Sequence, residues 1–424
     1  MKKILSLFFG FLCIFAANAA QVANVEYVHT LIEQEWDISI PYNSALSDVH
    51  TVANMKYLLT AIDVANEILN GEPTTNYGNG EFATLHAADT IATNQAVETL
   101  IQKPIEYKFF LTTTSTNSFS FKISAAGEFV VDWGDGTVET ITKPDTTNTV
   151  YSHNYDTAGA YTIGIGGQAT AYNTDEYTAS ISFYVNSSQT KIASIDGSLG
   201  AIFGTLSSDT NNQPKFYRTF YGATNMTGSI PSDLFAGISG APAERMFYYT
   251  FSGCSGLTGA IPDGLFVGIS GAPAFAMFYG TFHGCSGLTS IPSDLFAGIS
   301  GAPVSKMFDS TFEDCSGLTG AIPDGLFGNL TGAPAYGMFD STFSDCSGLT
   351  SIPENLFGNI SGTAQSNMFF QTFYNCTSLT GPSARINGQY LYEIWPDATS
   401  GQVGDMYYRA TKLDDYSNIP SAWK

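Results

Sequence analysis

TFSGCSGLTGAIPDGLF, residues 250–266, is one of four near-copies in the chain. The others are TFHGCSGLTSIPSDLF from Thr281, TFEDCSGLTGAIPDGLF from Thr311 and TFSDCSGLTSIPENLF from Thr342. Thr-Phe pairs begin at 219, 250, 281, 311, 342 and 372, which sets a period of 30 or 31 residues. Each unit is too short to bury its aromatic side chains alone, so stacked units must share one core. The repeat predicts a solenoid over residues 194–424.

Within each unit, the residue pattern predicts a short parallel strand. Leu257 and Ile261 would point inward and Thr258 outward, and Pro262 would end the strand because proline cannot donate to a ladder. The longer Gly-Ala form of the unit predicts a bulge. We expect the remaining segments to return as short helices or 3₁₀ turns. The outward threonines would form a polar row of Thr227, Thr258, Thr289, Thr319, Thr350 and Thr380.

The two end units differ from the others, as capping repeats do. Both have Ala-Thr where the inner units have Cys-Ser, at Ala223-Thr224 and at Ala410-Thr411. Trp423 stands where the inner units have phenylalanine. The 25-residue insertion 381–405 before the last unit predicts a projecting loop or hairpin.

The pattern F-x-x-C-x-x-L-T-x-I-P resembles the BspA-like leucine-rich repeats of bacterial surface and secreted proteins. The period departs from that family, and the excess lies in loops such as FAGISGAPAER, residues 235–245. The resemblance implies a secreted or cell-surface binding role, often adhesion, without a known ligand.

Residues 107–193 switch to period two and glycine-rich turns, which predicts antiparallel strands. VDWGDGT (131–137) followed by YSHNYDTAGAYTIGI (151–165) resembles a PKD-type domain. That resemblance implies an immunoglobulin-like β-sandwich. Asp132 and Asp135 lack the dense oxygen array that calcium needs, so we interpret them as turn formers.

The N-terminus predicts export. Lys2 and Lys3 precede an apolar run and a small-residue cleavage motif, so residues 1–20 are a predicted signal peptide. Residues 21–106 show three- and four-residue apolar spacing and predict a helical region whose role the sequence does not define. We expect a secreted or cell-surface protein, with the periplasm as the other possible compartment. The predicted fold class is thus multi-domain α+β: helical region, β-sandwich, then leucine-rich-repeat solenoid with a short parallel sheet.

The cysteine ladder leaves three interpretations. Five cysteines follow the signal peptide, so complete disulfide pairing would leave one over. Equivalent residues on adjacent turns lie within disulfide range but point their Cβ atoms the same way. No C-x₂-C spacing suits zinc. We therefore expect a structural thiol ladder, with a disulfide or a metal site as the alternatives, at Cys254, Cys285, Cys315, Cys346 and Cys376.

Charge and missing motifs narrow the function. A net charge of −22 opposes binding to nucleic acid or anionic membranes, and no later segment is long and apolar enough to span a membrane. The chain carries no nucleophile elbow, zinc-protease helix, phosphate loop or dinucleotide fingerprint. We expect no cofactor, no metal and no enzymatic activity. A hydrolase with an unrecognised carboxylate site is the third-ranked hypothesis.

Positions that vary between repeats while their neighbours stay fixed are expected to be exposed. Aromatic residues there predict a binding face with aromatic ends and an acidic middle, although they could instead only cover the edge of the core. The leading hypothesis is an extracellular interaction or adhesion protein that binds a protein or a glycan. The alternative is a carbohydrate-binding accessory protein of a secreted polysaccharide-degrading system. The expected face comprises Tyr248, Tyr249, Tyr279, His283, Asp309, Glu313, Asp340, Phe370 and Tyr374.

Overall fold

The computed structural model describes residues 107–206 and 212–424. These ranges lie in one compact unit, which begins at Leu100. The predicted signal peptide (1–20) and the predicted helical region (21–106) lie outside the described residues.

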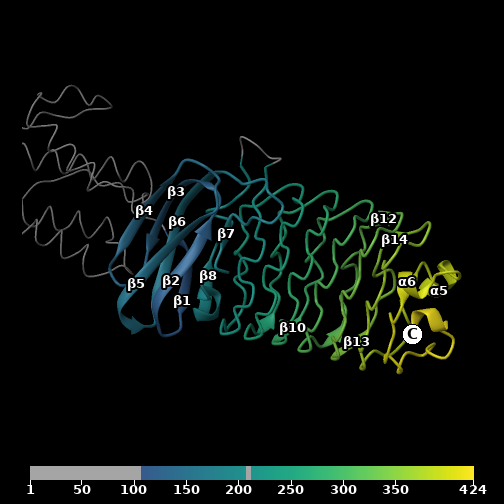
Figure 1. Ribbon diagram of the computed structural model, residues 1–424. Helices are drawn as coiled ribbons and strands as arrows, with labels where there is room; N and C mark the ends of the chain where they lie inside the picture. Colours follow the sequence, from purple (N-terminus) through teal and green to yellow (C-terminus); the bar gives the residue numbers. More distant parts are fainter. Residues whose placement is uncertain (1–106, 207–211) are drawn as a thin grey trace, which may run out of the picture. The chain divides into compact units, whose positions relative to one another are not determined.

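The first part of the described chain forms two antiparallel sheets (Figure 1). One sheet has the strand order β4-β3-β6-β1-β8 and the other has the order β5-β2-β7. The predicted strands of this region are therefore present, and β8 extends the first sheet past residue 193. The strands are β1 (Tyr107–Thr113), β2 (Thr116–Ile123), β3 (Ala126–Asp132), β4 (Val138–Lys143), β5 (Thr149–Gly159), β6 (Thr162–Ala171), β7 (Ile181–Ser182) and β8 (Ile192–Gly197).

The two sheets share an aromatic core. Alternation along the strands sends every second side chain inward, so Phe109 of β1 and Phe121 of β2 are fully buried. The Phe121 ring lies 5.5 Å from that of Trp133, and the Phe109 ring stacks on Phe183 at 5.9 Å. Close packing of large rings stabilises this region without any disulfide.

The hairpin between β3 and β4 has the turn chemistry that its sequence predicts. The Gly134 N–H donates to Asp132 Oδ1 and the Thr137 N–H donates to Asp135 Oδ1, both at 2.9 Å. Gly134 has a φ of 84°, and a Cβ there would lie 2.5 Å from the carbonyl oxygen of Thr162. Both aspartates are thus engaged as turn formers.

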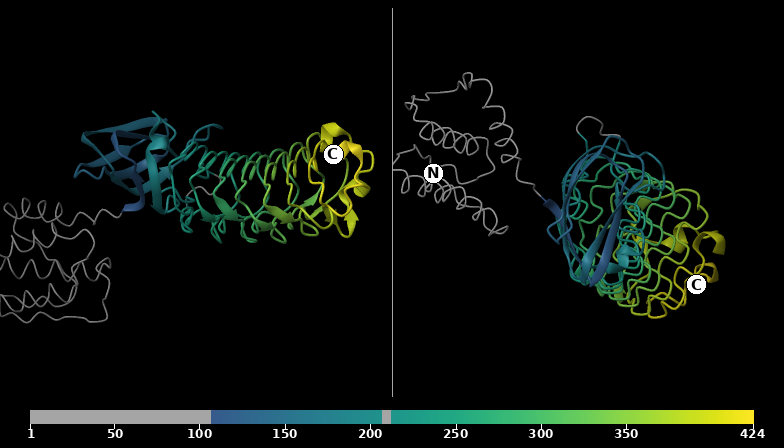
Figure 2. Two further views of the ribbon diagram at one scale, coloured as in Figure 1. Left: turned by 90° about the horizontal axis from the view of Figure 1, so that it is seen from below. Right: turned by 60° about the vertical axis from the view of Figure 1, so that its left-hand side comes forward.

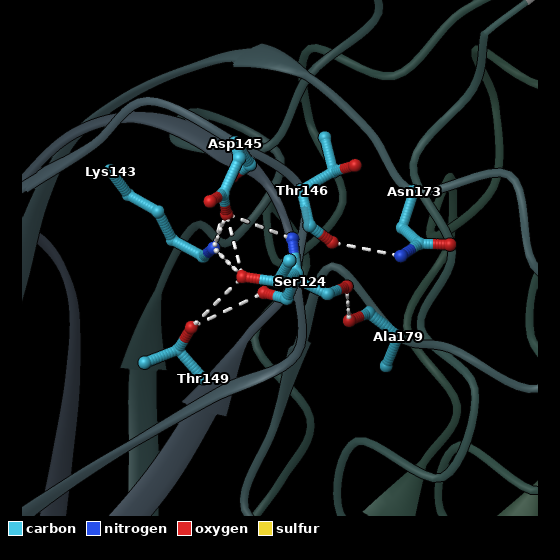
Figure 3. Close-up of polar contacts among 8 residues, drawn as sticks. Ser124, Lys143, Asp145, Thr146, Thr149, Asn173 and Ala179 are labelled. Carbon is cyan, nitrogen blue, oxygen red and sulfur yellow. Dashed lines mark hydrogen bonds and ion pairs between the residues drawn. The ribbon is translucent and has the colours of Figure 1, made fainter.

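A buried lysine orders the connection from β4 to β5 (Figure 3). Lys143 Nζ donates to the carboxylate of Asp145 at 2.7 Å and to Thr147 Oγ1 at 3.2 Å. The hydrogen bond from Lys143 is the largest influence on Asp145 and lowers its pKa well below the usual range. Asn173 reaches the same loop through the carbonyl of Thr146 at 2.8 Å.

The repeats stack turn upon turn after this region (Figure 2), and we call residues 212–424 the repeat stack. One side of every turn is the segment from Met-Phe to the cysteine, and these segments together form the turn wall. In the wall, the Phe247 N–H donates to the next turn at Met277, whereas the Tyr248 N–H donates back to Arg245 within its own turn. Tyr249 again donates forward, to Tyr279 at 2.8 Å. Reverse-turn bonds within a turn and bonds to the next turn thus alternate along the wall and together satisfy its backbone.

On another side of the stack, neighbouring turns meet in very short parallel pairs. Proline follows each isoleucine here, so pairing stops after two or three residues. The pairs that contain the longer Gly-Ala form show register shifts, but the skipped residue is Thr289 or Thr350 on the shorter neighbouring strand, not a residue of the Gly-Ala form where we expected the bulge. The pairs on this side are β9 (Gly259–Ala260) with β10 (Leu288–Ser290) and β11 (Gly320–Ala321) with β13 (Leu349–Ser351). A third pair, β12 (Thr331–Gly332) with β14 (Asn359–Ile360), joins the glycine-rich loops on a different side of the stack.

The predicted fold class is wrong. Most strand residues in the described ranges belong to antiparallel sheets, and the helices there are at most four residues long. A leucine-rich-repeat solenoid with a short parallel sheet and helical returns is therefore not what the structure contains. The wall cannot be helical because left-handed residues recur every fourth position, as at Arg245 and Tyr249, each with a φ of 54°. The predicted helical N-terminus remains outside the described residues.

Phenylalanine columns fill the inside of the repeat stack. Phe251 stacks on Phe282 at 5.6 Å, and Phe282 stacks on Phe312 at 5.7 Å, with the rings nearly parallel. Two further columns follow the same rule, one through Phe247 and one through Phe266. Each ring is therefore covered by the equivalent rings of the turns before and after it, which is why a single unit could not fold alone.

Threonine and cysteine hold these columns together through inter-turn hydrogen bonds. The buried Thr281 hydroxyl donates to the carbonyl of Phe247 at 2.9 Å, and the Cys285 thiol donates to that of Phe251 at 3.1 Å. The outward threonine row is exposed, as expected from the strand pattern. The thiols are free, buried and bonded in the same way to the preceding turn at Cys254, Cys285, Cys315, Cys346 and Cys376.

The two ends of the repeat stack are closed differently. At the first turn, the Thr219 hydroxyl donates to the carbonyl of Ile181 in β7 at 2.8 Å, so the sheets cover this end. At the last turn, Trp423 is fully buried and its carbonyl accepts the Tyr407 N–H. The insertion contains the hairpin β15 (Arg385–Ile386) with β16 (Gln389–Tyr390). The remaining helices are η1 (Ser188–Lys191), α5 (Leu391–Ile394), α6 (Ser400–Val403) and η2 (Ser421–Trp423).

Candidate binding face on the turn wall

The variable positions of the repeats lie on the turn wall. Because turns of the wall bond in register, equivalent residues from successive turns form rows, and we call these rows the variable strip. One row starts Tyr217, Tyr248, Tyr279 and continues through acidic residues to Phe370. A second row runs through His283 and Glu313 to Tyr374 and Tyr408. A row between these two contains Arg218 and Tyr249, so the predicted face residues lie on a single strip of the wall, with Asp309 buried within it.

The first turns of the strip form an aromatic end. The Tyr248 ring stacks on Tyr217 at 5.2 Å and on Tyr279 at 4.7 Å, with interplanar angles of 18° and 17°. Tyr249 meets Tyr248 edge-on at 4.7 Å. Burial raises the pKa of Tyr248 to about 12. These rings are half-buried and cover one another's faces, so they offer edges and hydroxyl groups to a ligand more than open faces.

Arg218 lies within this aromatic end. Its guanidinium carbon is 5.3 Å from the centre of the Tyr217 ring, 5.0 Å from that of Tyr221 and 5.6 Å from that of Tyr249. Such distances are those of cation–π contacts. Among the described residues no carboxylate forms an ion pair with Arg218, and its buried Nε has no hydrogen-bond partner. By contrast, Arg245 one turn later is paired with Glu176 at 3.2 Å.

The acidic middle contains one carboxylate, that of Asp309, whose exposure we predicted wrongly. We expected Asp309 to be exposed, but only 4% of it is accessible. Its carboxylate accepts hydrogen bonds from Ser310 Oγ at 2.9 Å and from Lys306 Nζ at 3.2 Å. Burial, with the nearby charge of Asp340 added to it, raises the pKa of Asp309 to about 7. The variable position is thus buried because its own turn supplies polar partners for it.

The other acidic residues of the middle stay partly accessible. Glu313 and Asp314 have side chains 29% and 56% exposed, and they lie 3.8 Å and 3.6 Å from His283 Nε2. Burial raises the pKa of Glu313. Asp340 is half-buried and accepts a hydrogen bond from Asn367 at 2.9 Å, and burial raises its pKa too. Carboxylates thus cluster in this part of the strip, next to the cationic side chain of Lys306 and the imidazole of His283.

The last turns are again aromatic. Tyr374 stacks on Tyr408 at 4.9 Å, and the guanidinium of Arg409 lies 5.6 Å from the Tyr408 ring. Phe370 is half-buried beside them in the strip. Sequence reasoning missed the residues that the end units contribute, because we interpreted those units only as caps. These residues could have been found by aligning the end units with the inner units on the Thr-Phe pair or its equivalent. They are Tyr217, Arg218, Tyr221, Tyr408 and Arg409.

We searched the described ranges for metal-binding clusters, reactive thiols and membrane-spanning helices. Within residues 107–206 and 212–424, no group of three or more histidine, cysteine or acidic side chains is placed to hold a metal ion. Burial raises the pKa of each ladder thiol, which disfavours the nucleophilic thiolate. In those same ranges no helix is long and apolar enough to cross a membrane.

Comparisons with known proteins do not assign the chain to a family. No protein-family model matches it, and neither a curated protein nor a solved structure matches it. The resemblances to BspA-like repeats and to PKD-type domains therefore stay predictions from the quoted motifs.

Proposed function

We propose that this chain is a non-enzymatic interaction protein that acts in an exported compartment, and that the variable strip is its binding surface. The observation that supports this is the contrast within each turn. The core positions repeat almost without change, whereas the wall positions differ from turn to turn in charge, aromaticity and size. A surface that only covered the core would need no such variety.

A protein partner suits the strip better than a glycan. Sugar rings bind to open aromatic faces, and the faces of Tyr217, Tyr248 and Tyr279 are stacked on one another. Tyrosine and arginine, which make up both ends of the strip, are instead the residues enriched at protein interfaces. The role of a carbohydrate-binding accessory protein is the second candidate, and it has only the half-exposed Tyr374 and Tyr408 pair in its favour.

A differential capture experiment tests this proposal. Mature wild-type protein, a Tyr248→Ala/Tyr279→Ala/Tyr374→Ala variant and a Thr258→Ala/Thr289→Ala/Thr319→Ala control would be presented to intact cells, mucus and a glycan array. The control alters the exposed threonine row away from the wall. We expect a partner that the wild type and the control retain and the tyrosine variant loses. A partner that all three retain would contradict the strip as the binding surface.

Cell fractionation tests the compartment. The proposal expects the protein in the medium or on the cell surface, with the periplasm as the alternative location. Recovery from the cytosol with residues 1–20 still attached would contradict export.

A further inference from the structure

Arg218 is a cation that has no ion-pair partner among the described residues. Its Nε is buried and has no hydrogen-bond partner. Its two terminal nitrogens make no hydrogen bond within the described residues either. Three tyrosine rings, those of Tyr217, Tyr221 and Tyr249, lie around the guanidinium. Arg218 is half-buried, and a planar guanidinium whose terminal nitrogens have no partner among the described residues matches the two oxygens of a carboxylate.

The acidic middle lies a fixed distance along the strip from that cation. The row Tyr221, Ser252, His283, Glu313 places the Glu313 level three turns after the Arg218 level. Turns that bond backbone to backbone follow one another at roughly 4.8 Å, so the two levels are roughly 14 Å apart. An extended polypeptide covers that distance in about four residues.

These two features together select one kind of ligand. We propose that the variable strip binds an extended polypeptide segment of a partner protein, in which an acidic side chain pairs with Arg218 and a basic side chain, about four residues away, pairs with Glu313 and Asp314. This inference rests on the proposed function and names the partner of the same surface. An acidic glycan would satisfy Arg218 but would leave the acidic middle without its cation.

Protonation in the acidic middle adds a pH dependence. The groups that face it are Lys306, Asp309, Asp340 and His283, with Tyr249 and Tyr279 on the preceding turns. The raised pKa of Asp309, about 7, means that the middle gains negative charge as pH rises through neutrality. Binding of the basic side chain should therefore tighten over that interval, and proton release should accompany it.

Selection from a randomised dodecapeptide display library tests the inference. The baits are the wild type, Arg218→Gln, Arg218→Lys, Glu313→Gln/Asp314→Asn, and the control Arg385→Gln. Arg385 is an arginine near one tyrosine ring, Tyr390 at 6.0 Å, but it is already paired with Glu354 at 3.5 Å. Thermal unfolding of each bait establishes that it is folded.

We expect the wild type and the Arg385 control to enrich peptides in which an acidic and a basic residue are about four positions apart. A synthetic peptide from that set should bind Arg218→Gln about tenfold more weakly or worse, and Arg218→Lys should not restore binding, because lysine lacks the bidentate edge. The acid-neutralised variant should lose the preference for the basic residue alone.

Three results would overturn the inference: no enrichment, enrichment without the charge pair, or equal affinity for Arg218→Gln. Binding of an oligogalacturonate that depends on Arg218, without peptide enrichment, would replace the peptide by an acidic glycan. The proposed function fails separately, if the tyrosine variant retains every captured partner. A partner lost by the tyrosine variant but kept by Arg218→Gln would leave the proposed function standing and remove this inference.

Discussion

The two parts of the described chain both bury aromatic rings and pair their backbone groups, but they do so in different ways. In the sheets of residues 107–197, each strand pair has its own register, and the core rings Trp133 and Phe121 have no equivalents elsewhere. In the repeat stack, one set of contacts recurs at every turn, down to the hydrogen bonds of Thr281 and Cys285. Coupling in the stack therefore runs to nearest neighbours, whereas the sheets should unfold as a unit.

The largest expected effect comes from removing a core ring in each region. Phe312→Ala deletes a fully buried ring stacked on both neighbouring turns. Trp133→Ala deletes a buried ring that packs against Phe121 in the core of the two sheets. Each should lower the free energy of unfolding by about 3–5 kcal/mol. Hydrogen exchange should then quicken mainly in the turns around Phe312 for the first variant and across the sheets for the second. Identical exchange patterns would break the comparison.

The free energy of unfolding should depend on pH with opposite sign in the two regions. Burial alone would raise the pKa of Asp135, but hydrogen bonds from His153 and Thr137 hold it at about 2, so this carboxylate contributes stability that is lost as pH falls from about 4 towards 2. Asp309 has a raised pKa of about 7, so the folded state binds its proton more tightly and stability declines as pH rises from about 4 to 7.

Two asparagine variants isolate these contributions in unfolding curves measured across pH. Asp309→Asn should flatten the decline between about pH 4 and 7, and Asp135→Asn should weaken the loss in acid. A decline that persists unchanged in Asp309→Asn would show that this carboxylate does not carry the effect.

Within the repeat stack, the two threonine rows give a matched pair. The Thr281 hydroxyl is buried and bonded to the preceding turn, so Thr281→Val should cost about 1–3 kcal/mol by leaving a buried carbonyl with a weaker set of partners. Thr258 is exposed, and Thr258→Val should change the unfolding free energy by less than about 0.5 kcal/mol. Denaturant titrations compare the two, and equal effects would contradict the division into inner and outer rows.

The smallest effect is expected from the cysteines. Native protein should react slowly with an alkylating reagent because the ladder thiols are buried, and protein unfolded without reductant should show five reactive thiols after the signal peptide is removed. Cys315→Ala keeps most of the volume and should lower stability by about 1 kcal/mol. A count of one thiol would indicate two disulfides and would replace the ladder interpretation.

Sequence reasoning recovered the parts of the fold that depend on periodic burial. The spacing of Thr-Phe, the inward Leu257 and Ile261, the small residue at Cys254 and the alanines of the end units all follow from which side chains must face a shared core. It failed on backbone conformation, because inward-facing positions at a fixed period are compatible with helices, strands or reverse turns alike.

The sequence by itself therefore determined the period, the end units and the side chains that fill the core, since burial of apolar surface requires only the pattern of residue types. Only the tertiary structure decided that the wall is made of reverse turns, that Asp309 is buried, and that Arg218 is surrounded by tyrosine rings from two successive turns. These features combine local contacts, such as those of Asp309 with Lys306 and Ser310, with contacts between residues about 30 positions apart, and the latter exist only once the turns are stacked.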